Sequence, residues 1–234
     1  GRLQLRADRK HRQIVNERGW VEHDPEEIYR NTLAAVGDLL EQSGADREKI
    51  RCFGISNQRE TAVAWNRKTG RPVYNAVVWQ CPRGKDICDG IAAQGRADEI
   101  QAATGLRLSP YFSAAKLAWI LQNAEGAKEA AARGELCCGT MDSWLVWKLT
   151  GGREFRTDYS NASRTQLFNI TSLRWDENLC KIFGVPRQCL AEPTDSDGLF
   201  GMTDLGGLLP RAVPIHGVLG DSHAALFGQG CLEK

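Results

Sequence analysis

The sequence lacks the features that mark several large classes of protein. No apolar run approaches the roughly 18 residues of a membrane-spanning helix. The first residues, GRLQLRADRKHRQIV, are too charged for the core of a signal peptide. The net charge is only +1 and the charges are interspersed, so there is no electrostatic case for binding nucleic acid or an anionic membrane. We therefore expect a cytoplasmic protein with neither a membrane nor a nucleic acid as its partner.

Paired-cysteine motifs are also missing, although the chain of 234 residues has eight cysteines. None forms a CxxC pair or a zinc-ribbon spacing, and a disulfide framework is not expected at this size. Cys52 and Cys137 lie in apolar, strand-like runs, where a free thiol behaves as a small hydrophobic group. We interpret the cysteines as reduced core or surface thiols. His223 has no second ligand at metal-binding spacing, so no metal site is predicted.

The two common phosphate-binding loops are absent as well. The sequence contains no GxxxxGK[ST] and no GxGxxG after a strand. What it does contain is an alternation of strand and helix patterns, without a repeat or a linker, which predicts an α/β fold. Helices are predicted over 25–43, 141–150 and 175–185, and strands over 1–15, 49–56, 135–140 and 213–220, with a hairpin formed by 61–65 and 72–79.

Three polar stretches follow strands or interrupt helices: NQRET, SPYFS and GDSH. A polyol pocket needs hydrogen-bond donors and acceptors beside an apolar wall. Arg59 offers a fork of donors, Glu60 accepts, and Tyr111 does both while presenting a flat face. Trp79 could supply the apolar wall, and Asp221, after a strand and a glycine, could accept a hydroxyl proton.

Each of these residues also has a simpler interpretation. Arg59 and Glu60 could form a solvated or ion-paired loop, and Tyr111 and Trp79 could belong to the core. Asp221 could be a helix N-cap, because aspartate is a favoured capping residue. His223 could be a surface residue in the first turn of a helix. The residues alone leave these alternatives open.

Longer stretches of the sequence closely resemble the N-terminal domain of the FGGY carbohydrate kinases, and in particular their glycerol kinase branch. The resemblance runs from about residue 18 to residue 231 and implies the ribonuclease-H-like, actin-like fold, with a mixed sheet flanked by helices. The stretches that carry it are GWVEHDPEEIY, GISNQRETAVAWNRKTGRPVYNAVVWQC, TGLRLSPYFSAAKLAWIL, GTMDSWLVWKLTGG, TDYSNASRTQLFNI and GDSHAALFGQ.

The resemblance implies a role for each candidate residue. Arg59 and Glu60 would hold glycerol hydroxyls, Trp79 would pack against the glycerol carbons, and Tyr111 would donate a hydrogen bond to glycerol. Asp221 would be both the general base and a glycerol contact. The family motif has GDQQ where this chain has GDSH, so Ser222 would take the place of a glutamine that touches glycerol. Its shorter side chain leaves room for a larger polyol.

Two further features of the family have no match in the sequence. Family members begin with a strand and a DQGTTS-like phosphate loop, and they carry a second domain that holds ATP. We therefore expect residues 1–234 to be an incomplete N-terminal, polyol-binding domain that lacks its first strands and its C-terminal ATP-binding partner. Alone it would be inactive, and its open sheet edge would favour association, so a homo-oligomer is left open.

The predicted function is that of the polyol-binding domain in a glycerol-kinase-like phosphotransferase. The whole protein would use ATP and Mg²⁺ to convert glycerol to glycerol 3-phosphate, with ADP as the other product. Two alternatives remain at this point. One is a kinase for another sugar or polyol, and the other is a catalytically dead sugar-binding module.

Overall fold

The strands of the computed structural model, which describes residues 3–231, form two larger sheets and two short pairs. The first sheet has the order β1-β2-β5-β4-β6 and is antiparallel throughout. The second has the order β11-β12-β3, in which β12 runs antiparallel to β11 and parallel to β3. The strands are β1 (Ile14–Val15), β2 (Val21–His23), β3 (Phe53–Asn57), β4 (Ala62–Asn66), β5 (Ala76–Val77), β6 (Leu136–Thr140), β7 (Arg156–Asp158), β8 (Phe168–Asn169), β9 (Arg174–Trp175), β10 (Glu192–Thr194), β11 (Leu199–Thr203) and β12 (Val213–Gly220).

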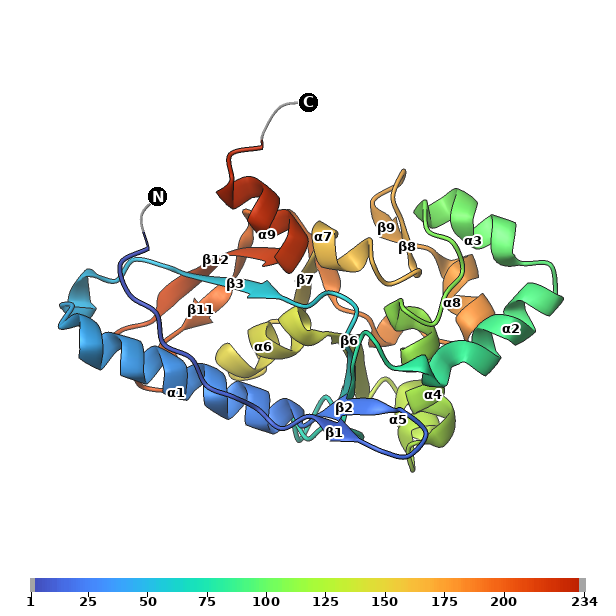
Figure 1. Ribbon diagram of the computed structural model, residues 1–234, viewed down its shortest axis with the longest axis horizontal. Coiled ribbons are helices and arrows are strands. Elements are labelled where there is room, and N and C mark those ends of the chain that lie inside the picture. Colours follow the sequence, from blue (N-terminus) through green and yellow to red (C-terminus); the bar gives the residue numbers. More distant parts are fainter. Residues whose placement is uncertain (1–2, 232–234) are drawn as a thin grey trace.

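Helices cover both sheets, and α6 lies between them (Figure 1). Helices α2, α3, α4, α5 and α8 gather at the other end of the molecule from β3 and β12. The α-helices are α1 (Pro25–Ser43), α2 (Lys85–Ala93), α3 (Ala97–Thr104), α4 (Ser113–Asn123), α5 (Ala127–Ala132), α6 (Met141–Leu149), α7 (Tyr159–Ala162), α8 (Glu177–Phe183) and α9 (Asp221–Gly228), and the 3₁₀ turns are η1 (Arg47–Lys49), η2 (Pro82–Gly84) and η3 (Arg187–Cys189). None of the helices within residues 3–231 is both long and apolar enough to cross a bilayer.

Local sequence signals account for several of these elements. Asp24 caps α1 by accepting a hydrogen bond from the Glu26 N–H, and Pro25 occupies the first helical position. Gly44 ends the helix in the left-handed conformation that glycine adopts without strain. Asp176 caps α8 in the same way. The predicted helices over 25–43, 141–150 and 175–185 are therefore confirmed to within two residues.

Two apolar cores hold the elements together. One surrounds α4, of whose eleven residues eight are buried, and the other surrounds the edge-to-face pair Trp65 and Trp144, whose ring centroids lie 5.2 Å apart. The buried Arg83 guanidinium lies between the rings of Trp20 and Trp119 and pairs with Glu22 at 2.7 Å. Cys137 is a core thiol, whereas Cys52 is exposed, so the run 49–56 is a buried strand only in part.

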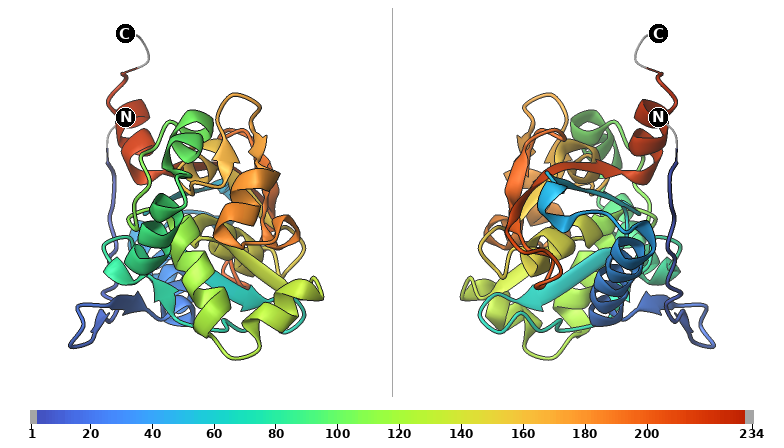
Figure 2. Two further views of the ribbon diagram at one scale, coloured as in Figure 1. Left: turned by 90° about the vertical axis from the view of Figure 1, so that its right-hand side faces the viewer. Right: turned by 90° about the vertical axis from the view of Figure 1, so that its left-hand side faces the viewer.

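The predicted strand over residues 1–15 is wrong for most of its length. Residues 1–2 lie outside the described chain, residues 3–13 form no strand, and only Ile14–Val15 pairs with β2. Leu3 and Leu5 are exposed. The segment instead follows the outside of α1, as Figure 2 shows, where the Glu27 carboxylate accepts from the Arg12 N–H and Asn31 donates to the Lys10 carbonyl. The alternating apolar residues of this segment therefore do not form a buried face.

The predicted hairpin is present but short. Strand β4 pairs with β5 only through Ala62 and Val77, and an isolated bridge joins Trp65 to Pro72. Between these points the chain bends away, because Tyr74 and Asn75 turn to donate hydrogen bonds to the buried Glu22 carboxylate. The longer partner of β4 is β6, with five paired residues.

One carboxyl group in the core gives a prediction about stability. Asp142, at the start of α6, is fully buried and accepts from the hydroxyls of Thr140 and Thr157. Burial, and next the charge of Asp158, raise the pKa of Asp142 from 3.8 to about 6. An acid whose pKa is raised by folding binds its proton more tightly in the folded state, so stability falls as the pH rises from about 4 to 6.

We expect the substitution Asp142→Asn to remove this loss of stability with rising pH. Each pKa unit corresponds to about 1.4 kcal/mol. The free energy of unfolding of the variant should therefore gain about 2–3 kcal/mol relative to the original chain between pH 4 and pH 7. Urea unfolding at the two pH values measures it. Asp46→Asn, at an exposed cap, is the control, and a pH-independent difference for Asp142→Asn would contradict the prediction.

Candidate functional site

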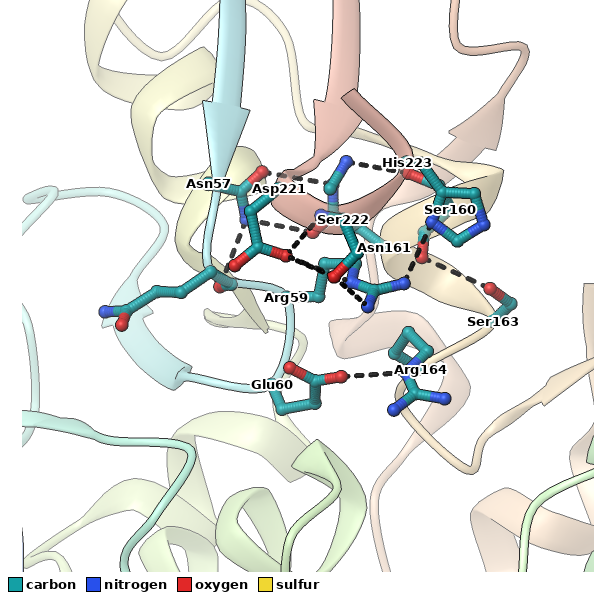
Figure 3. A network of polar contacts seen from close by, with 12 residues as sticks. Asn57, Arg59, Glu60, Ser160, Asn161, Ser163, Arg164, Asp221, Ser222 and His223 are labelled. Carbon is teal, nitrogen blue, oxygen red and sulfur yellow. Dashed lines mark hydrogen bonds and ion pairs between the residues drawn. The ribbon is translucent and has the colours of Figure 1, made fainter. Parts of the chain in front are cut away.

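Two parallel neighbouring strands end side by side and bring the polar stretches together. Asn57 at the end of β3 is in register with Gly220 at the end of β12. The chain after β3 continues into Arg59 and Glu60, and the chain after β12 begins α9 at Asp221. Open α/β sheets place ligands at the carboxyl ends of such strands. The topology thus explains why NQRET and GDSH meet (Figure 3).

Arg59 is buried, and α9 surrounds its guanidinium group. Its Nη1 lies 2.9 Å from His223 Nδ1, its Nη2 donates to Ser222 Oγ at 3.0 Å, and its Nε lies 3.4 Å from the Asp221 carboxylate. Because arginine can only donate, His223 Nδ1 must be the unprotonated ring nitrogen. These contacts of the Arg59 guanidinium therefore fix the first three residues of α9. They matter because α9 has no buried residue of its own.

The absence of a side chain at Gly220 allows this arrangement. A Cβ atom at position 220 would lie 1.9 Å from Arg59 Cδ and 2.3 Å from Cγ. The arginine stem thus lies directly against the backbone at the end of β12. Gly220, rather than Asp221, is also the N-cap of α9, and it makes no side-chain capping bond. The interpretation of Asp221 as a helix N-cap is therefore wrong.

Asp221 keeps one carboxylate oxygen available. Its Oδ1 accepts from the Ser222 N–H at 2.7 Å and faces Arg59, while its Oδ2 has no hydrogen-bond partner within residues 3–231. Its side chain is 57% exposed. A carboxylate oxygen without a hydrogen-bond partner can accept a proton from a bound hydroxyl.

Glu60 is buried and pairs with a residue that the sequence did not point to. Its Oε1 accepts from Arg164 Nε at 2.7 Å. The Arg164 guanidinium lies 4.9 Å from the ring centroid of Phe112 and 6.0 Å from that of Tyr111. Arg164 therefore links NQRET to the aromatic stretch SPYFS. A lone arginine in NASRTQ, without an acidic neighbour in sequence, was the only available signal for it.

Trp79 and Tyr111 form an exposed aromatic wall beside this ion pair. Their side chains are 37% and 38% exposed, so neither belongs to the core, and their ring centroids lie 5.8 Å apart. Partial burial, and next the Glu60 charge, raise the pKa of Tyr111. The phenol therefore stays protonated and able to donate a hydrogen bond. The backbone N–H of Trp79 donates to Thr61 Oγ1, which ties this wall to the end of NQRET.

Helix α7 supports the strand ends from behind. Asn57 and Asn161 exchange two side-chain hydrogen bonds of 2.9 and 3.1 Å, and the Gly220 N–H donates to Ser160 Oγ at 2.8 Å. Asp158 caps α7 and also accepts from Ser196. These buried partners fix the ends of both β3 and β12. The sequence analysis did not single them out.

The predicted site residues thus form a continuous series of contacts. Asp221, Ser222 and Arg59 make one cluster, and Glu60, Tyr111 and Trp79 make the next through Arg164. The interpretation of Arg59 and Glu60 as a solvated or ion-paired loop is therefore wrong about solvation, because both are buried, and confirmed about ion pairing. His223 lies in the first turn of α9, as expected, but also contacts Arg59. Cavities of about 420 and 460 Å³ lie elsewhere, beside α8 and α2. The part of the chain that the structure describes holds no cluster of three residues suited to a metal ion.

Comparisons with known proteins agree with this fold. The N-terminal domain of the FGGY family of carbohydrate kinases matches residues 1–228. Glycerol kinase 1 of Thermotoga maritima is 55% identical over 94% of this chain and 44% of its own length. Glycerol kinase of Carboxydothermus hydrogenoformans is 49% identical over 97% of this chain and 45% of its own. The crystal structure of Plasmodium falciparum glycerol kinase with ADP has a TM-score of 0.89 and 35% identity, covering 97% of this chain and 45% of that one. This chain spans less than half the length of these relatives.

Proposed function

Because the chain belongs to the FGGY family of carbohydrate kinases, and has its α/β, actin-like fold, we propose that it forms the polyol-binding part of a glycerol kinase. The whole protein would transfer the terminal phosphoryl group of ATP to glycerol, giving glycerol 3-phosphate and ADP. The observation that carries the proposal is the meeting of the Arg59 fork with the Asp221 carboxylate beside the wall of Trp79 and Tyr111. The relatives described above as glycerol kinases support the choice of substrate.

Each site residue binds a different part of glycerol. Arg59 donates to one hydroxyl group, and Glu60 accepts from another through the oxygen that Arg164 leaves free. Tyr111 donates or accepts at the same face, and Trp79 packs against the carbon chain. Each hydroxyl then meets a charged or polar partner, while the apolar edge of glycerol meets an aromatic ring.

Asp221 acts as the general base in this proposal. It accepts the proton of the hydroxyl group that attacks the phosphoryl group, as its available Oδ2 allows, and Arg59 Nε, 3.4 Å from Oδ1, holds the carboxylate in place. ATP and its Mg²⁺ are proposed for the whole protein. Within residues 3–231 no metal-binding cluster is found, so the chemistry assigned to this chain is the binding of the polyol and the acceptance of its proton.

A second candidate substrate rests on Ser222. Its hydroxyl group is held by Arg59 and approaches Asp221 at 3.3 Å, so it stays close to α9. A serine side chain extends less far than the glutamine of the family motif, which favours a polyol larger than glycerol. Calorimetric titration with glycerol, erythritol and xylitol separates the two candidates, and the proposal expects glycerol to bind most tightly.

The same titration tests the pairing of hydroxyl groups with partners. We expect propane-1,2-diol, which lacks one hydroxyl group, to bind at least about tenfold more weakly than glycerol, because a buried charged partner is left unpaired. Equal affinities for the two would contradict the assigned contacts. No detectable binding of any polyol by the whole protein, or no glycerol-dependent formation of ADP, would instead favour an inactive module.

A further inference from the structure

A buried ammonium group lies directly behind Tyr111. Lys116, in the first half of α4, is fully buried. Its Nζ donates to the backbone carbonyls of Pro110, Tyr111 and Phe112, at 2.8 Å for the first and 3.1 Å for the last. It lies 6.0 Å from the ring centroid of Tyr111. All three of its N–H groups therefore donate to carbonyl groups of the turn 110–112. This turn carries Tyr111 and places its ring at the site.

This placement is costly for a lysine. The ammonium group has lost its water, and it lies near the N-terminus of α4, where the helix dipole repels a cation. Burial lowers the pKa of Lys116 from 10.5 to about 7, against the opposing effects of Cys81, Glu60 and Cys88. A methionine would fill the same volume without this cost. The charge of Lys116 is therefore explained by the three carbonyl groups that its ammonium group binds, and not by the packing of its side chain.

Among the described residues, the groups around Lys116 include no unpaired carboxylate that could neutralise its charge. Glu60 faces it from the loop after β3, but this carboxylate is paired with Arg164. Cys88, on α2, faces it, and burial raises the pKa of this thiol to about 11. Cys81, before η2, also faces it and accepts a hydrogen bond from Arg83 Nε. Among the described residues, only the three carbonyl groups hydrogen-bond the ammonium.

We propose that Lys116 is the positioning residue for Tyr111, and that glycerol binds more tightly when Lys116 is charged than when it is neutral. The proposal rests on the proposed polyol function. A neutral amine has two N–H groups, so one of the three carbonyls loses its donor and the other two bonds lose their charge assistance. The turn 110–112 then loosens, and Tyr111 no longer holds its position against Trp79 and Arg164.

The test follows Tyr111 and glycerol affinity separately. The chain has four tyrosines, so ¹³C labelling of the tyrosine rings gives few resonances, and loss of one set in Tyr111→Phe assigns it. We expect the Tyr111 resonance alone to titrate with a midpoint near the pKa of about 7 of Lys116. Between pH 6 and pH 9 the calorimetric Kd for glycerol should rise by about tenfold. By linkage, saturating glycerol should move the Tyr111 midpoint up by about one pH unit.

Three variants identify the group responsible. Lys116→Arg stays charged at these pH values, so its Tyr111 resonance and glycerol affinity should not change with pH in this range. Lys116→Met should bind glycerol as weakly at pH 6 as the original chain does at pH 9. Lys148→Met removes another partly buried lysine, which pairs with Glu26 far from the site, and should behave as the original chain does.

The outcomes separate the two proposals. If glycerol does not bind at any pH, the polyol function fails, while the ¹³C titration of Tyr111 still decides whether Lys116 controls Tyr111. If glycerol binds, but with a Kd that is constant from pH 6 to pH 9 and with no titration at Tyr111, the role of Lys116 is overturned. A pH response that persists unchanged in Lys116→Arg overturns it too. Should Lys116→Met not fold, the titration of the original chain and of Lys116→Arg gives the answer.

Discussion

Replacing Asp221 with asparagine is expected to lower the kcat of the whole protein by roughly 10²–10⁴-fold, the usual contribution of a general base. Asparagine keeps the size of the side chain and can still accept from the Ser222 N–H. It removes the charge that would accept the hydroxyl proton. Glycerol-dependent formation of ADP, measured with saturating substrates, reports the change.

The melting temperature should barely move in the same variant. Gly220 occupies the N-cap position of α9, asparagine can keep the bond that Asp221 accepts from the Ser222 N–H, and the 57% exposed carboxylate contributes little as an ion pair. Asp176→Asn is a matched control, because asparagine caps α8 about as well as aspartate and this residue lies outside the site. An Asp221→Asn enzyme with near-full turnover would remove Asp221 from the catalytic role.

Local signals in the sequence predict the elements that depend on their own residues. Helices α1 and α8 begin at aspartate caps and end at left-handed glycines, and β12 is a mostly apolar run interrupted by His216, so each follows from neighbouring residues. The segment 3–13 does not follow in this way. Its alternating leucines suggest a strand, but no strand within residues 3–231 pairs with it, and side chains of α1 hydrogen-bond its backbone instead.

The contacts within the candidate site are even harder to predict from the sequence than the segment 3–13. The type of each residue in NQRET and GDSH suggests what it can bind, and the family resemblance suggests how, but the contacts among them cross the whole chain. Arg164 and Lys116 illustrate what sequence alone leaves out. One is an ordinary surface-type arginine in a loop and the other a lysine in an apolar helix. Only the fold brings them to Glu60 and to the turn of Tyr111.

Replacing Arg59 with alanine is expected to weaken glycerol binding by roughly tenfold to a hundredfold, because one hydrogen bond from a charged donor contributes about 1.5–3 kcal/mol. The structure adds a second consequence. Arg59 also holds Asp221, Ser222 and His223, so α9 should loosen, and amide hydrogen exchange in 221–228 should become faster. Calorimetry and exchange measured on the same variant report the two effects.

Two further variants separate a role in binding from a role in support. Arg59→Lys keeps the charge but not the fork, so it should keep part of the affinity and lose the simultaneous contacts to Ser222 and His223. Gly220→Ala removes no donor, yet its Cβ would lie 1.9 Å from Arg59 Cδ and must displace the arginine stem. If Arg59 binds glycerol directly, Gly220→Ala should weaken binding nearly as much as Arg59→Ala does. If Gly220→Ala speeds exchange in α9 while glycerol affinity stays unchanged, Arg59 supports the helix and does not contact the polyol. Arg156→Ala, which removes a partly exposed pair with Glu154, should change neither measurement.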